Sequence, residues 1–237
     1  LSVGETELVA STLGLDSLVY QSTPNSRGYQ PVGGRTDIVS YLEKKYSKYV
    51  VVSAGAKQSV HAALHYMEFS GKKTLNRQEP HWAIFNKTFS LYPFSISSSF
   101  DKNPDSFNFI VSPNNPDGKI FSSTIENYKI HDAVYNLDYY TDHVLNNIGD
   151  IEIYSFSKML GISGARVGFC LTSSLEARDY ISNYIEEMTV GVSAASQIMA
   201  LNGLKILENT DMSIVKTTLL SNKLRLIESL RDYGVFK

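Results

Sequence analysis

Short apolar runs rich in β-branched and aromatic residues recur along the chain, and stretches with helical periodicity separate them. The runs are continuous rather than alternating, which is typical of strands that other elements cover on both faces. This pattern predicts strands at residues 49–53, 93–97, 107–112, 127–131, 151–155 and 166–172, with a weaker strand near the segment "KTLN".

The intervening stretches place apolar residues at helical spacing. They predict helices at residues 35–48, 57–70, 174–188, 193–209 and from about 211 to 232. Because strands and helices alternate, we expect an α/β fold, a three-layer α/β/α sandwich with a mostly parallel sheet of about seven strands. Such sheets bind ligands at the carboxyl ends of their strands, so the residues that follow each strand are the candidates for function.

Composition narrows the choice of partner. The 237 residues are 43% hydrophobic and 19% charged, as in a globular chain that buries a sizeable core. A net charge of -2 gives no extended positive surface, so we expect a small-molecule partner and neither nucleic acid nor a membrane. Cys170 is the single cysteine, and the five histidines lack metal-ligand spacing. We therefore expect a cytoplasmic protein without a bound metal.

Two of the turns after predicted strands have polar groups suited to ligand binding. In "AGAKQSVHAAL", the amides of Gly55, Ala56 and Lys57 open a helix, where unpaired N–H groups and the helix dipole favour an anion such as phosphate. In "SPNNPDGKI", the turn fixes an asparagine amide at the end of a strand, where it could donate to a phenolate or carbonyl oxygen. Taken alone, the first segment is more typical of an ordinary turn, and the second fits an ordinary turn as well as a binding site.

The segment "HDAVYNLDYY" places Asp132 just past a predicted buried strand. A carboxylate there needs a partner in order to stay ionised, and a cationic ring nitrogen would serve. Tyr135, three residues later, could reach the same ligand. The alternative is an aspartate that caps a turn.

The segment "YSFSKMLGISGARVGF" places Lys158 on a serine- and glycine-rich turn after another predicted buried strand. Desolvation there would favour the neutral amine, which can form a Schiff base with an aldehyde. Ser155, Ser157 and Arg166 have the hydroxyls and the guanidinium that suit a phosphate dianion. Together with the preceding motifs, these groups match what pyridoxal 5′-phosphate requires.

The order and spacing of four segments resemble those of the fold-type I, class I/II aminotransferases that use pyridoxal phosphate, and most nearly the plant alliinase and tryptophan aminotransferase group. The segments are "SPNNPDG", "HDAVYNLDYYTD", "SFSKMLGISGARVGF" and "YIEEMTVGVSAASQ". The resemblance runs from about Tyr29 to Ile206. It implies the large domain of that fold over residues 1–210, and at 211–237 the start of a helix leading to a C-terminal small domain that is absent from this chain or truncated.

The resemblance also implies roles for individual residues. Lys158 is expected to form the Schiff base and to carry the proton between the substrate and the cofactor, while Asp132 pairs with the ring nitrogen. Asn115 and Tyr135 are expected at the phenolate oxygen, and Trp82 on the ring face. The groups expected at the phosphate are Gly55, Ala56, Lys57, Ser155, Ser157 and Arg166, together with Tyr29 of one subunit reaching the other subunit's cofactor in a homodimer.

The implied activity is transfer of an amino group between an L-amino acid and a 2-oxo acid, and the resemblance favours an aromatic substrate. The same cofactor residues fit an alliinase-type lyase that expels a group from Cβ, and a non-catalytic domain that keeps the fold is the third hypothesis. No residue can be named for the substrate carboxylate. Arg225 and Arg231 are expected on a solvated helix face.

Overall fold

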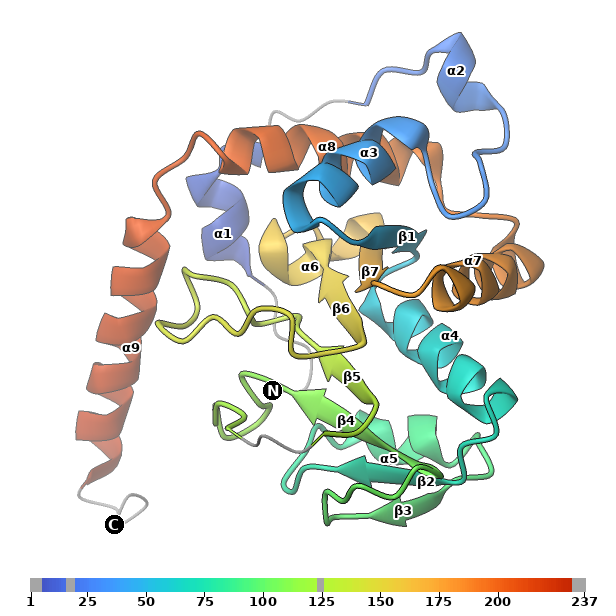
Figure 1. The fold of residues 1–237 in the computed structure, drawn as a ribbon. Coiled ribbons are helices and arrows are strands. Elements are labelled where there is room, and N and C mark those ends of the chain that lie inside the picture. The colour runs from blue at the N-terminus through green and yellow to red at the C-terminus, as the bar shows by residue number, and fades with distance from the viewer. Residues whose placement is uncertain (1–5, 16–19, 123–125, 232–237) are drawn as a thin grey trace.

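A computed structural model describes residues 6–15, 20–122 and 126–231 (Figure 1). Its centre is a seven-stranded sheet with the order β1-β7-β6-β5-β4-β2-β3. β7 is antiparallel to both of its neighbours, and the remaining pairs are parallel. The strands are β1 (Tyr49–Ser53), β2 (Thr74–Arg77), β3 (Ser95–Ser97), β4 (Ser106–Val111), β5 (Lys129–Asp132), β6 (Ile151–Ser155) and β7 (Gly168–Thr172). The predicted mostly parallel sheet is confirmed.

Helices cover both faces of this sheet, and a separate apolar core lies on each face. On one face the core is formed with α4 (Ala56–Phe69), α5 (Ile84–Phe89) and α7 (Leu175–Thr189). On the other face it is formed with α1 (Glu7–Thr12), α3 (Thr36–Tyr46), α6 (Phe156–Met159), α8 (Ala194–Leu207) and the start of α9 (Ser213–Arg231). The predicted three-layer sandwich is therefore also confirmed.

The continuous apolar runs are explained by this double cover. In β1, Val50 and Val52 pack into one core, and Val51 between them packs into the other. All six residues of β4 are buried. Because successive side chains of a strand point to opposite faces, a strand buried on both sides has no polar alternation.

Several elements differ from the sequence-based expectation. α1, α5, α6 and α2 (Pro24–Arg27) are four to six residues long and were not predicted, because such short helices contain too few turns to produce a periodic pattern. β5 ends on Asp132, so this residue closes the strand rather than following it. β7 begins at Gly168, so Arg166 lies in the turn before the strand. The predicted end of the last helix, Asp232, lies outside the described residues.

In the described ranges, no helix combines the length and the apolar character needed to cross a membrane. α9 extends away from the sheet and touches α1 (Figure 1). Arg225 and Arg231 on this helix are exposed, as expected.

Candidate active site

A pocket of about 290 Å³ lies at the carboxyl ends of β4, β5 and β6. It brings together side chains that are up to 110 positions apart in the sequence, from Ala56 to Arg166 (166 − 56 = 110). Its lining includes most of the predicted cofactor residues: Ala56, Lys57, Trp82, Asn115, Asp132, Tyr135, Ser155, Ser157, Lys158 and Arg166.

One end of the pocket is built for an anion. The first turn of α4 places Ala56 and Lys57 there, and the first amides of a helix have no intrahelical acceptor. Ser155 is the N-cap of α6, where its hydroxyl accepts a hydrogen bond from the Ser157 amide at 3.2 Å. The same pocket therefore gathers the N-terminus of α4, the hydroxyls of two serines, and the cationic side chains of Lys57 and Arg166.

Gly55 and Arg166 fit together closely at this end. Gly55 has φ of +89°, and a Cβ at this position would lie 2.8 Å from Nη2 of Arg166. Arg166 itself has φ of +49°, and its guanidinium donates to the carbonyl of Ser163 at 2.8 Å and to that of Ala54 at 3.5 Å. Only glycine leaves room for the guanidinium here and adopts this backbone conformation without strain. Gly55 thus supports the pocket without appearing in its lining.

Lys158 lies on α6, directly after β6. Its Nζ is 5.6 Å from the centre of the Tyr135 ring, which comes from the turn after β5. A lysine ammonium at this distance from an aromatic face is in favourable contact with it. Lys158 and Tyr135, two of the three predicted catalytic residues, therefore meet in the pocket that also contains the third, Asp132.

Asp132 is the acidic residue in the lining, and its side chain is buried. Burial raises the pKa of its carboxyl from the ordinary 3.8 to about 7, and a hydrogen bond from the Val134 amide opposes the shift. A buried carboxylate in such a position is stabilised by a cation that enters the pocket. Burial and the charge of Asp132 also raise the pKa of Tyr135.

Asn115 reaches the pocket from the turn after β4, and its neighbour Asn114 holds that turn in place. The Asn114 amide group donates to the Pro80 carbonyl at 2.9 Å and to Asp117 at 2.7 Å. The Gly118 amide closes the turn by donating to the Asn114 carbonyl at 2.8 Å. Because Pro80 precedes Trp82 by two residues, these contacts also connect the two segments that bring Asn115 and Trp82 to the pocket.

Apart from Trp82, the largely apolar wall of the pocket was not predicted from the sequence. Trp82 packs edge-on against Phe85, with ring centres 5.4 Å apart. The rest of this wall consists of Val60, Ile84, Thr88, Val111 and Val134. Val111 closes β4 and Val134 lies two residues after the end of β5, so their places at strand ends were available signals. The α5 residues gave none, because α5 itself was not predicted.

Tyr29 does not reach this pocket. It lies between α2 and α3 and is 89% exposed. Its predicted role in another subunit's site therefore stays a prediction.

A family model described as allinase (Alliinase_C) matches residues 41–222. Tryptophan aminotransferase-related protein 2 of Arabidopsis thaliana is 26% identical over 175 residues, which are 69% of this chain and 40% of that protein. Alliin lyase of Allium cepa var. aggregatum is 34% identical over 104 residues, which are 43% of this chain and 23% of that protein. The chain thus spans well under half the length of these relatives.

Solved structures share the fold over nearly the whole chain. An aspartate aminotransferase of Thermotoga maritima matches with a TM-score of 0.68 and 23% identity, over 99% of this chain and 71% of that one. A Thermus thermophilus aspartate aminotransferase matches with a TM-score of 0.74 and 14% identity, over 98% of this chain and 70% of that one.

The raised pKa of Asp132 predicts a pH-dependent cost to stability. The pKa of this carboxyl is about 7 in the folded protein and 3.8 ordinarily, so the unfolded chain gives up the proton more readily. The free energy of unfolding therefore falls as pH rises from about 4 to about 7, and the full destabilisation is present above pH 7. Asp132→Asn, which cannot ionise, should therefore stabilise the ligand-free protein by about 2 to 3 kcal/mol more at pH 8 than at pH 5. Urea unfolding at the two pH values measures this difference, with the exposed Asp138→Asn as the control. An equal effect of Asp132→Asn at both pH values would contradict the assignment.

Proposed function

This chain belongs to the allinase family, which depends on pyridoxal 5′-phosphate, and we propose that it is an aminotransferase that moves an amino group between an L-amino acid and a 2-oxo acid. The observation that carries this proposal is one pocket that gathers a lysine, a buried carboxyl group and an anion-binding helix end. Each of these groups suits a different part of the cofactor.

The residues present fit the cofactor. At the anion-binding end, the α4 amides, the two serine hydroxyls, Lys57 and Arg166 would hold the phosphate dianion. Gly55 leaves the space that Arg166 needs in order to lie beside this turn. Asp132 lies in the same pocket, where its carboxylate would pair with the protonated ring nitrogen.

Once bound, pyridoxal phosphate supplies an electron sink for the pair of electrons left when the substrate loses its Cα proton. Lys158 would hold the cofactor covalently through its side-chain nitrogen. After the amino group of the substrate has displaced it, the freed lysine amine would take the proton from the substrate Cα and later give it up again. Asp132 would keep a proton on the ring nitrogen, and this charge pair would contribute most to stabilising the reacting state. Asn115 and Tyr135 would donate to the phenolate oxygen, while Trp82 would cover the ring face.

The apolar wall supports a substrate with an apolar side chain. Val60, Ile84, Phe85, Val111 and Val134 leave no charged group on that side of the pocket. The cationic residues of the lining are Lys57, Lys158 and Arg166, and all three are assigned here to the cofactor. We therefore propose an aromatic or aliphatic amino acid as the donor.

Tyr29 supports the proposal of a homodimer with shared active sites. Its ring is 89% exposed and lies outside the pocket of its own chain. A large aromatic side chain gains most when a partner covers it. In the proposed dimer, Tyr29 donates its hydroxyl to the phosphate bound in the partner.

An alliinase-type lyase is the second candidate, because alliin lyase of Allium cepa var. aggregatum is among the relatives at 34% identity. Lys158, Asp132 and Arg166 would serve both reactions, so the products decide between them.

The proposed reaction predicts glutamate as a product. Purified protein supplied with pyridoxal phosphate, 2-oxoglutarate and either L-phenylalanine or L-tryptophan should form glutamate, and L-aspartate should be used at least about tenfold less efficiently in kcat/KM. Lys158→Ala is the control and should form none. An S-alkyl cysteine sulfoxide assayed alongside tests the lyase.

If the sulfoxide gave pyruvate and ammonia and no amino acid gave glutamate, the result would contradict the aminotransferase proposal and support the lyase. No product in either assay would leave the non-catalytic domain as the better description.

Shared active sites predict complementation between two inactive variants. Co-expressed Lys158→Ala and Tyr29→Ala chains should form mixed dimers in which one site carries both defects and the other carries neither. With random pairing, about a quarter of all sites are intact, so about a quarter of wild-type activity should return at limiting cofactor. Activity no greater than the average of the two homodimers would argue that each site belongs to a single chain.

A further inference from the structure

The helix that carries Lys158 is too short to hold itself in place. α6 has four residues, and its C-terminal end is closed by the Leu160 amide donating to the Phe156 carbonyl at 2.9 Å. The last four carbonyls of any helix lack an intrahelical donor, so those of Ser157, Lys158 and Met159 all need partners from elsewhere. An unpaired carbonyl in a buried position is costly.

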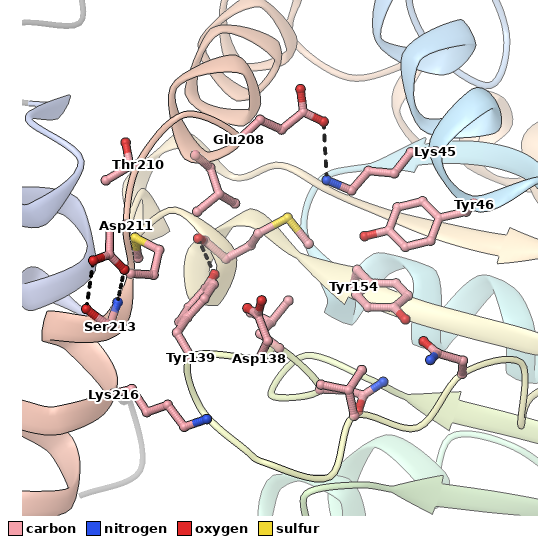
Figure 2. Close-up of a pocket in the computed structure, with 17 residues that line it drawn as sticks. Lys45, Tyr46, Asp138, Tyr139, Tyr154, Glu208, Thr210, Asp211, Ser213 and Lys216 are labelled. Carbon is pink, nitrogen blue, oxygen red and sulfur yellow. Dashed lines mark hydrogen bonds and ion pairs between the residues drawn. The ribbon is translucent and has the colours of Figure 1, made fainter.

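Three hydroxyl groups from distant segments supply these partners. The Thr6 hydroxyl donates to the Ser157 carbonyl at 2.9 Å, and the Tyr140 hydroxyl donates to the Lys158 carbonyl at 2.9 Å. The Tyr139 hydroxyl donates to the Met159 carbonyl at 2.5 Å, a contact drawn in Figure 2. Three consecutive carbonyls, with that of the lysine at the centre, are therefore each held by a separate side chain.

The segments that supply these hydroxyls are themselves fixed. Gly161, just after α6, has φ of +75°, and a Cβ there would lie 2.7 Å from the Thr6 carbonyl. The chain at Thr6 therefore packs directly on the residue that follows α6 by two positions. The tyrosine loop is closed by Asn136, whose side chain donates to the Leu145 carbonyl at 2.6 Å and accepts from the Leu145 amide at 2.8 Å.

The two tyrosines remain donors over a wide pH range. Burial raises the pKa of both Tyr139 and Tyr140 above the ordinary value, so neither phenol ionises near neutral pH. Tyr139 is 4% exposed, although it and Met159 line a second cavity of about 720 Å³ beside α9. Figure 2 shows this cavity, with Tyr46 and Tyr154 on the side opposite Ser213 and Lys216 of α9.

We propose that Thr6, Tyr139 and Tyr140 form a hydroxyl clamp that positions Lys158 for catalysis. The clamp rests on the proposed function, because it matters to the reaction only if Lys158 is the reacting amine. None of the three lines the pocket. They act through the main-chain carbonyls of α6 and are therefore positioning residues. Fixing the Lys158 carbonyl fixes the direction in which its side chain leaves the backbone, and displacement of a reacting group by about 1 Å can cost about a hundredfold in rate.

The clamp is tested by Tyr140→Phe, which removes one hydroxyl and keeps the ring. In the cofactor-loaded protein, kcat should fall about tenfold to a hundredfold while KM stays within about threefold. The pH midpoint of the Schiff-base absorbance should move by at least about half a unit, because the lysine nitrogen no longer sits at the same distance from its neighbours. In cofactor-free protein, the absorbance should rise more slowly after pyridoxal phosphate is added.

Tyr92→Phe is the matched control, because the Tyr92 hydroxyl also donates to a main-chain carbonyl, that of His61, at 2.9 Å, and neither residue lines the pocket or contacts α6 through this bond. It should leave kcat and the pH midpoint at their wild-type values. Thr6→Val and Tyr139→Phe provide the same test if Tyr140→Phe does not fold, and each should shift the midpoint.

Two outcomes would overturn the clamp. If the clamp variants kept the wild-type midpoint and lost no more activity than Tyr92→Phe, the hydroxyls would be ordinary structural contacts while the proposed function stood. If the wild-type protein formed no Schiff base that Lys158→Ala abolishes, the proposed function would fail and the clamp with it.

Discussion

The register of three parallel strands is the constraint on which the pocket depends. Val111 of β4 pairs with Asp132 of β5, and Asp132 pairs with Ile153 of β6, so the three strands end at nearly the same level. The turns that follow them carry Asn115, Tyr135 and Lys158 to one edge of the sheet. Strand pairing therefore brings the polar groups together before any of them contacts a ligand.

The antiparallel strand β7 completes the site from the opposite direction. Gly168, its first residue, pairs with Ser53 at the end of β1 and with Ser155 at the end of β6. Arg166, two residues earlier, must therefore lie beside the turn that contains Gly55, where its guanidinium is found. This geometry brings a lysine and an arginine that are eight residues apart into the same pocket, where we propose that they bind opposite ends of the cofactor.

Much of this arrangement was predictable from the sequence, because buried strands and the longer helices leave periodic patterns, and because the polar motifs follow strand ends. The direction of β7 was not, since no local pattern tells whether a buried strand runs parallel or antiparallel. The helices α5 and α6 were too short to leave a signal, so the apolar wall at Phe85 was missed. The hydrogen bond from Thr6 to Ser157 joins residues that are 151 positions apart, and no local sequence pattern predicts it.

The central claim is that this edge of the sheet grips pyridoxal phosphate at two points, by Lys158 at one end of the pocket and by Arg166 at the other. Titration of the cofactor-free protein with pyridoxal phosphate, followed by absorbance and by equilibrium dialysis, tests it most directly. The account predicts a Schiff-base band that Lys158→Ala abolishes without abolishing binding, and binding at least about tenfold weaker in Arg166→Gln than in Arg178→Gln, a half-buried arginine outside the pocket lining. A band that survives in Lys158→Ala, or equal affinities for the two arginine variants, would contradict it.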